Sequence, residues 1–154
     1  MSSSSLTDKI AIESYFNTQW ASATPIRFES APFIQPGTQN TTRRPWVSLY
    51  IREMMGWQAS LGNDSPLRRY SGLIINQVFT DLNIGTATGM NLAMNIADIW
   101  RDASFTTGTT GRITCSGFLD GARNTEPKIE IIGDDGHNWF QINVTTRYLR
   151  QDYI

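Results

Sequence analysis

Histidine and cysteine are almost absent from this sequence. Its 154 residues contain one of each, His137 and Cys115. A single cysteine cannot form a disulfide within the chain, which suits a reducing compartment or a protein indifferent to redox conditions. Cys115 alternates with Ile113 ahead of Gly117. This pattern predicts a small buried hydrophobic side chain instead of a nucleophile.

An excess of charge of one sign is also missing. Thirteen Lys and Arg residues stand against fourteen Asp and Glu residues, for a net charge of −1. This balance argues against binding of nucleic acid or membrane through bulk electrostatics. No segment is as apolar and long as a membrane span, and no basic region followed by an apolar run suggests a secretory signal. The composition, 40% hydrophobic and 18% charged, fits one soluble globular domain over residues 1–154.

The first predicted helix follows a flexible polar arm at residues 1–5. Apolar side chains then recur, up to about residue 20, at the spacing of one helical face. Pro25 marks the exit from this helix. The predicted apolar face consists of Leu6, Ile10, Ile12, Phe16 and Trp20.

The second predicted helix lies within residues 83–103. Its polar side chains form a narrow stripe of Asn91, Asn95, Asp98 and Asp102, and apolar side chains cover most of the remaining surface. A helix that is apolar over so much of its girth is buried on more than one side. We therefore expect it to lie between the sheet and another element, or to contact a partner subunit.

Five segments have the composition or the alternation of strands: residues 46–52, 69–80, 112–118, 128–132 and 139–149. The first two predict a hairpin whose connection, residues 54–68, projects as a long loop. Residues 30–45, rich in Pro, Thr and Asn, form a second long loop. The order of helix, two strands, helix and three strands predicts an α+β fold, with a mostly antiparallel sheet packed against two main helices.

Asp134, Asp135 and His137 are the candidates for a metal or catalytic site. A metal site needs about three converging ligands, whereas consecutive aspartates in an extended chain point in opposite directions. The sequence offers no second histidine to complete a set. Gly133 and Gly136 flank the acidic pair between two predicted strands, which is typical of a hairpin turn. We interpret the segment as a turn and predict neither catalytic nor metal-binding residues.

The segment Gly85–Gly89, "GTATG", precedes the second helix, where backbone amides can bind phosphate. It lacks the Lys-Ser/Thr pair of a P-loop and the G-x-G-x-x-G spacing of a dinucleotide site. Thr86 or Thr88 as a helix cap is the better interpretation. No G-x-S-x-G elbow is present, and no cofactor is expected.

Three segments together carry a family pattern. Residues 20–36, "WASATPIRFESAPFIQP", have a helix exit followed by T-P-I, an aromatic-Glu pair and F-x-P. Residues 45–51, "PWVSLYI", begin a strand with Pro-Trp, and residues 68–100 have R-x-x-G, an alternating strand, a glycine-rich turn and an Ala/Leu-rich helix. This pattern resembles the tail terminator proteins of long-tailed bacteriophages, a group related in fold to the lambda tail terminator. The chain departs from it in a longer first hairpin tip, which contains Trp57, and in the Asp134-Asp135 pair.

The resemblance implies a structural virion protein without enzymatic activity. Such a protein forms a homohexameric ring that caps the tail tube, stops its polymerisation and offers its other face to the head connector or neck protein. The expected location is the head-proximal end of the virion tail, and the host cytoplasm during assembly. Genomic DNA is expected only to pass through the lumen of the ring, and no membrane partner is expected. The alternatives are a head-completion or neck connector protein of the same particle, a small metal-dependent hydrolase, and a free-standing regulatory dimer.

A ring needs two different surface patches on each subunit. We expect the connection between Met54 and Arg69 to reach a neighbour or the rim of the tube. Two Arg pairs at loop–strand junctions and apolar side chains of the second helix are further candidates. The candidate subunit or tube contacts are Arg43, Arg44, Trp57, Arg68, Arg69, Met90, Met94 and Trp100.

Overall fold

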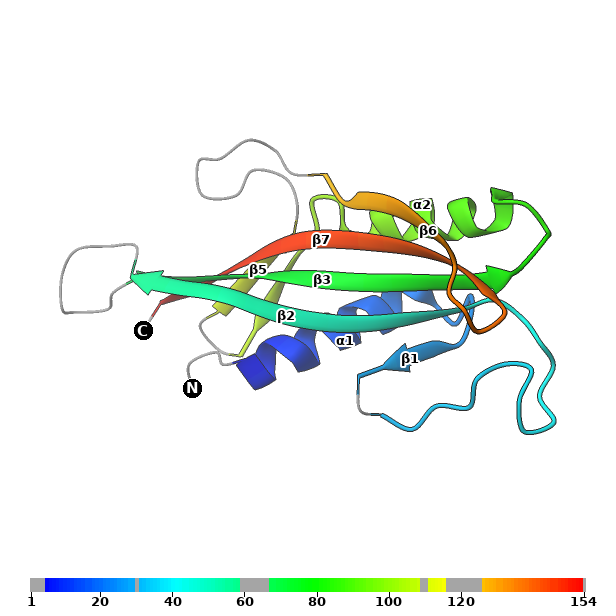
Figure 1. Cartoon of the computed structure of the whole chain (residues 1–154). Coiled ribbons are helices and arrows are strands. Elements are labelled where there is room, and N and C mark those ends of the chain that lie inside the picture. The colour runs from blue at the N-terminus through cyan, green and yellow to red at the C-terminus, as the bar shows by residue number, and fades with distance from the viewer. Residues whose placement is uncertain (1–4, 30, 59–66, 109–110, 116–125, 154) are drawn as a thin grey trace.

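The computed structural model describes residues 5–29, 31–108 without 59–66, 111–115 and 126–153, and leaves aside the side chains of residues 5, 54, 55, 57, 58, 67 and 153. Two helices and seven strands follow one another along these segments (Figure 1). They are α1 (Ser5–Trp20), β1 (Ile26–Phe28), β2 (Trp46–Gln58), β3 (Leu67–Asp81), α2 (Ala87–Trp100), β4 (Ser104–Thr107), β5 (Gly111–Cys115), β6 (Lys128–Asp134) and β7 (Trp139–Tyr153).

The strands form one sheet in the order β1-β2-β3-β7-β5-β4, and β6 pairs with β7 beside this path. Every pairing is antiparallel except that of β1 with β2, which is parallel. The expectation of an α+β fold with a mostly antiparallel sheet is therefore confirmed. The strands β1 and β4 were not predicted, because three or four residues are too short to display an alternation.

The sheet has two faces of different character. Alternate residues of a strand point to opposite faces, and the register fixes which residues of neighbouring strands share a face. Both helices lie on one side, behind β2, β3 and β7 in Figure 1. We call this side the helix face and the other side the open face. The open face is formed by every second residue from Trp46 to Arg52, from Arg69 to Phe79 and from Trp139 to Gln151, together with Arg27, Arg112, Thr114, Lys128 and Glu130.

The main hydrophobic core lies between the helix face and the two helices. Trp100 of α2 is 0% exposed, stacks on Phe16 of α1 and donates its indole N–H to Asn76 Oδ1 at 2.9 Å. The expectation that Trp100 contacts a partner subunit is therefore wrong, because this side chain fills the centre of the core. The remaining buried members are Ile12, Trp20, Val47, Leu49, Ile74, Val78, Ala93, Ile96, Ala97, Ala103, Ile113, Cys115, Ile142, Val144 and Tyr148.

Helix α1 is rotated relative to the predicted apolar face. Ile12, Phe16 and Trp20 are buried as expected, but Leu6 and Ile10 are 66% and 55% exposed. Asp8, one turn before Ile12, faces inward in their place and is 2% exposed. The prediction failed at these two positions because it ranked residues by hydrophobicity and did not foresee a buried carboxylate.

Helix α2 buries one side. Gly89, Ala93, Ile96, Ala97 and Trp100 are buried, whereas Met94 is 53% exposed. The expected burial between the sheet and another element therefore holds for one flank, and the apolar Met94 remains on the surface.

A buried ion pair joins the two ends of the chain. Arg150 Nη1 on β7 lies 2.5 Å from Asp8 Oδ2 on α1, and Thr107 Oγ1 on β4 donates to Asp8 Oδ1 at 3.1 Å. The Arg150 guanidinium also stacks over the ring of Tyr70, 3.9 Å from its centroid. Burial raises the pKa of Asp8, and the hydrogen bonds from Arg150 and Thr107 oppose that rise. The pair fixes α1 against the C-terminal half of β7.

The predicted loop over residues 54–68 is wrong at both ends. The β2–β3 ladder continues to Gln58 on one strand and starts again at Leu67 on the other, so that only residues 59–66 connect them. Gly56 lies inside the predicted loop, but it pairs with Tyr70 in the ladder, and a Cβ at Gly56 would lie 2.5 Å from the Tyr70 ring. This glycine is required by a close side-chain approach within a strand. Between residues 31 and 45, by contrast, the structure contains no helix or strand.

Replacement of Asp8 by Ala tests the buried pair. The change leaves the Arg150 charge buried without its partner, so we expect the free energy of unfolding to fall by about 3–5 kcal/mol. Replacement of exposed Gln19 of α1 by Ala is the matched control and should cost less than about 0.5 kcal/mol. Adding Arg150→Met to Asp8→Ala should recover part of the loss. Urea denaturation measures all four proteins, and equal stabilities of Asp8→Ala and Gln19→Ala would contradict the assignment.

Candidate interaction surface

The open face carries more basic than acidic side chains. No helix covers it within the described residues, and most of its side chains are partly or largely exposed, whereas Trp46, Ser48, Phe79, Trp139 and Leu149 are buried. Arg52 pairs with Glu29 at 2.7 Å, and Lys128 pairs with Glu130 at 3.8 Å. The strand positions on this face include one acidic residue, Glu130, and six basic residues: Arg27, Arg52, Arg69, Arg112, Lys128 and Arg147.

A surface cavity of about 360 Å³ lies at the β1–β2 side of the open face. Arg27 and Arg52 line it together with Ser48, Tyr50 and Gln77. The Arg52 guanidinium lies 4.8 Å from the centroid of the Tyr50 ring. The cavity is thus bordered by cationic and neutral hydrogen-bonding groups, and Glu29 is the one acidic residue on its wall.

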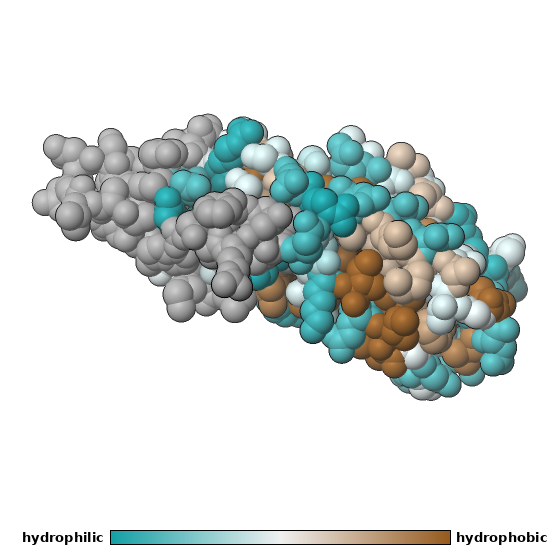
Figure 2. Space-filling model, turned by 90° about the horizontal axis from the view of Figure 1, so that it is seen from above, coloured by the Kyte–Doolittle hydropathy of each residue, from teal (hydrophilic) through white to brown (hydrophobic). Residues whose placement is uncertain are grey.

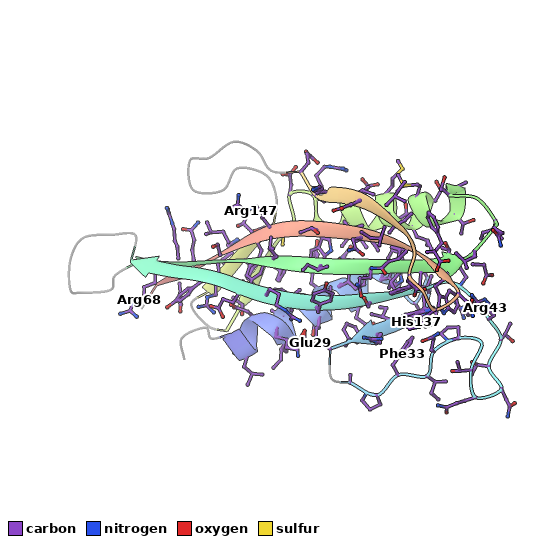
Figure 3. All side chains as sticks on the ribbon, in the orientation of Figure 1. Glu29, Phe33, Arg43, Arg68, His137 and Arg147 are labelled. Carbon is purple, nitrogen blue, oxygen red and sulfur yellow. The ribbon has the colours of Figure 1, made fainter. Side chains whose placement is uncertain are left out.

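An aromatic cluster closes one end of the same face. Trp46, Phe79 and Trp139 are buried there, and Phe33 from the 31–45 segment packs on them. Trp46 stacks on Phe79 with ring centroids 4.1 Å apart and meets Trp139 edge-on at 6.0 Å. A second cavity of about 250 Å³ adjoins the cluster, and Arg27 and His137 are among the residues that line it. Figure 3 labels Phe33, His137 and Arg43 at this end of the molecule.

Arg43 holds the aromatic end together. Its guanidinium donates to the Asp81 carboxylate at the end of β3 and to the carbonyl oxygen of Asn138, and it stacks 3.7 Å from the centroid of Trp139. These contacts tie the 31–45 segment to β3 and to the β6–β7 turn. The guanidinium is therefore already engaged within the chain, which argues against its predicted role as a subunit or tube contact.

Asp134, Asp135 and His137 form the tight β6–β7 turn, as predicted. Asp135 Oδ1 accepts hydrogen bonds from the backbone N–H groups of His137 at 2.7 Å and Trp139 at 3.1 Å, and Asp134 Oδ1 accepts one from Gly136 N–H at 2.8 Å. Both carboxylates therefore stabilise the turn. The described residues contain no group of three or more His, Cys, Asp or Glu side chains arranged to hold a metal ion.

The other predicted contact residues do not converge on one place. Arg68 is exposed at the hairpin end of β3, at the opposite end of the molecule from Arg43, as Figure 3 shows. Arg69 is partly buried beside it, and the side chain of Trp57 lies outside the described residues. Arg44 is exposed and lines a cavity of about 310 Å³ near Pro25. On α2, Met94 is exposed and Met90 packs partly against the core.

The remaining motifs are structural. Thr86 occupies the N-cap position of α2 without a side-chain capping hydrogen bond, and Gly85 adopts a positive φ of 83° in the preceding turn. Cys115 is 0% exposed, and burial raises the pKa of its thiol. Both properties fit the predicted small buried hydrophobic side chain. Neither α1 nor α2 combines the length and the apolarity that a membrane crossing requires.

Comparison with known proteins supports the fold of this chain and does not assign it to a family. No protein family model matches the sequence, and no curated protein matches it. Eleven chains of solved structures match the fold, and one of them superimposes with a TM-score of 0.63 and 13% sequence identity, over 95% of this chain and 97% of that chain. The α+β fold therefore exists in another protein over nearly its whole length. At this identity the likeness concerns the fold alone.

The basic open face was missed by the sequence analysis. Its members lie up to about 120 positions apart, from Arg27 to Arg147, and they share a face because of the β1–β2–β3–β7 register. The available signal was that Arg52 and Arg147 occupy the polar positions of alternating strands. That signal indicates an exposed side chain, but the strand neighbours that gather these residues cannot be read from one sequence.

Variants of the β6–β7 turn separate a structural from a chemical role. Asp135→Ala removes the acceptor of two backbone N–H groups, so we expect the free energy of unfolding to fall by about 1–2 kcal/mol. His137→Ala, at an exposed position of the same turn, should change it by less than about 0.5 kcal/mol. Thermal or urea denaturation measures both, and a larger loss for His137→Ala would count against the turn assignment.

Arg43 and Arg44 are adjacent and provide a matched pair. We expect Arg43→Ala to lower the free energy of unfolding by about 1–2 kcal/mol, because it removes a charged hydrogen bond and a cation–π contact. Arg44→Ala should stay within about 0.5 kcal/mol of the unmodified protein. The loss in Arg43→Ala should be accompanied by a change in tryptophan fluorescence, since Trp139 loses its stacking partner. Equal stabilities of the two variants would contradict the proposed clamp.

Proposed function

We infer that this chain is a structural virion protein that forms a hexameric ring, caps the tail tube of a long-tailed bacteriophage and provides the docking surface for the head connector. The inference starts from the sequence pattern of residues 20–36, 45–51 and 68–100. The α+β fold is compatible with it. The ring, the tube and the connector are the partners that this proposal requires.

The observation that carries the proposal is the presence of exposed apolar side chains on separate elements. On α1, Leu6 and Ile10 are 66% and 55% exposed, and on β6, Ile131 and Ile132 are 52% and 45% exposed. A ring built from identical subunits needs two different complementary patches on each one. Apolar groups on α1 and on β6 supply two such patches.

The patch on β6 has a local structural cause. The β6–β7 register shifts between Ile131 and Gly133, so Ile132 is an extra residue and two consecutive isoleucines become exposed. The strand β6 pairs with β7 on one side and, among the described residues, with no strand on its other side. Figure 2 looks down on the surface where β6 and α2 lie and shows hydrophobic side chains gathered there. An unpaired edge flanked by apolar groups is a suitable subunit contact.

The connector alternative, a head-completion or neck protein of the same particle, needs the same kind of surfaces. The enzymatic alternative, a small metal-dependent hydrolase, would have to use Asp134, Asp135 and His137. The carboxylates of that set accept backbone hydrogen bonds in the turn, which leaves them poorly disposed to hold a metal. A structural role in the particle therefore has stronger physical support than a metal-dependent hydrolase.

Removal of the gene from the virus distinguishes the first two possibilities. Without a terminator, polymerisation of the tail tube is not stopped, so we expect tails of uncontrolled length by negative-stain electron microscopy. Expression of the unmodified gene from a plasmid should restore uniform tails. Tails of normal length beside heads that have lost their DNA would instead identify a connector, and normal infectious particles would contradict both.

A further inference from the structure

We propose that the open face of the sheet binds the phosphate backbone of duplex DNA. Its strand positions carry six basic residues and one acidic residue in a chain whose net charge is −1. Glu29, which follows β1 and pairs with Arg52, is a second acidic residue on this face. Most of the fourteen acidic residues of the chain therefore lie away from the open face. Overall charge balance conceals this separation, because it averages the two faces.

The register arranges the basic side chains in a stripe along the sheet. Arg27 lies in the cross-strand row of Ser48 and Gln77, and Lys128 lies in the next row on this face, beside Thr145. Arg52 and Arg147 then share a row across Leu73. Arg69 and Arg112 share the row of Gln151, nearer the hairpin end.

The stripe has the dimensions of a duplex contact. On β3 the rows run from Gln77 to Arg69, eight residues, or about 26 Å at about 3.3 Å per residue. That distance corresponds to roughly eight base pairs of DNA at about 3.4 Å each. Basic side chains along such a length can neutralise several phosphates of one backbone.

Several of these cations are available for a ligand. Within the described residues, Arg27, Arg112 and Arg147 form no ion pair with a carboxylate, and all three are exposed. Arg112 Nε donates to the neutral hydroxyl of Ser104 at 2.9 Å and keeps its charge uncompensated. Guanidinium groups bind phosphate oxygens in a planar, bidentate manner.

The cavity of about 360 Å³ adds a suitable seat for a phosphate. Arg27 and Arg52 border it, and Ser48 and Gln77 contribute neutral hydrogen-bonding groups. Arg52 is paired there with Glu29 at 2.7 Å, so Arg27 supplies the uncompensated positive charge. Arginine, hydroxyl and amide groups are the side chains that position a protein on a DNA backbone without reading its sequence. We expect binding without base specificity and with a strong dependence on salt.

The location of this face in the assembly rests on the proposed function. In a ring through which the genome passes, the open face then lines the lumen, and its cations contact the passing duplex. The binding itself is a property of the single chain and is measured independently of the ring.

Fluorescence anisotropy with a labelled 20-base-pair duplex of random sequence tests the inference at about 50 and 150 mM salt. We expect the full-length protein to bind, and the triple variant Arg27→Gln, Arg112→Gln and Arg147→Gln to bind at least about tenfold more weakly at 50 mM. The slope of log K against log salt concentration should decrease in magnitude by up to about 2.7, since each phosphate contact contributes about 0.9. The matched triple control, Lys9→Gln, Arg44→Gln and Arg68→Gln, removes the same charge away from the open face and should bind within about twofold of the unmodified protein.

Thermal denaturation first establishes that both triple variants fold, and light scattering records their oligomeric state. Absence of binding by the unmodified protein at 50 mM salt, or equal losses in the two variants, overturns the inference. A face variant that folds but no longer forms rings also overturns it, because the open face is then a contact between protein chains. Ring formation without DNA binding leaves the proposed function standing, whereas DNA binding that depends on the face in a protein absent from virions refutes the proposed function alone.

Discussion

The placement of β3 between β2 and β7 is the constraint on which the rest of the structure depends. All residues of β3 pair with β7, and most of them also pair with β2. Side chains alternate between faces, so a shift of one residue in this register would exchange the core for the surface. The register puts Ile74, Asn76 and Val78 under the helices and puts Gln77 and Leu73 on the open face. The hydrophobic core and the open face, to which we assign DNA binding, both follow from this arrangement.

The two faces of the sheet differ in burial and in chemistry. The helix face stabilises the chain through a hydrophobic core that contains two buried polar contacts: Asn76 accepts from Trp100, and Asp8 binds Arg150. The open face is stabilised by the aromatic cluster and Arg43 at one end, and five of its six basic side chains, all but Arg69, are exposed. In the assembly that we propose, the exposed apolar side chains of α1 and β6 form the contacts between chains and the open face contacts DNA, because these two contacts require different chemistry.

The sequence was sufficient where periodicity was long or the local chemistry was specific. It predicted the two helices, the first hairpin, the buried Cys115 and the turn at Asp134 to Asn138. In that turn, glycine and aspartate have strong local conformational preferences. It failed where a distant partner decides the outcome. Asp8 faces inward because it pairs with Arg150, which is 142 positions away in the sequence. Gly56 belongs to a strand because Tyr70 packs on it. Trp100 is buried because it contacts Phe16 and Asn76. The basic open face was missed for the same reason, since pairing of non-consecutive strands creates it.

The central claim is that the chain is a structural component at the head-proximal end of a phage tail. Quantitative mass spectrometry of purified virions, combined with gold-labelled antibody against this chain in electron microscopy, tests that claim most directly. The account predicts a copy number equal to one hexamer per particle and label at the junction of head and tail. Virions that lack the chain, or label along the tube or on the head shell, would contradict it.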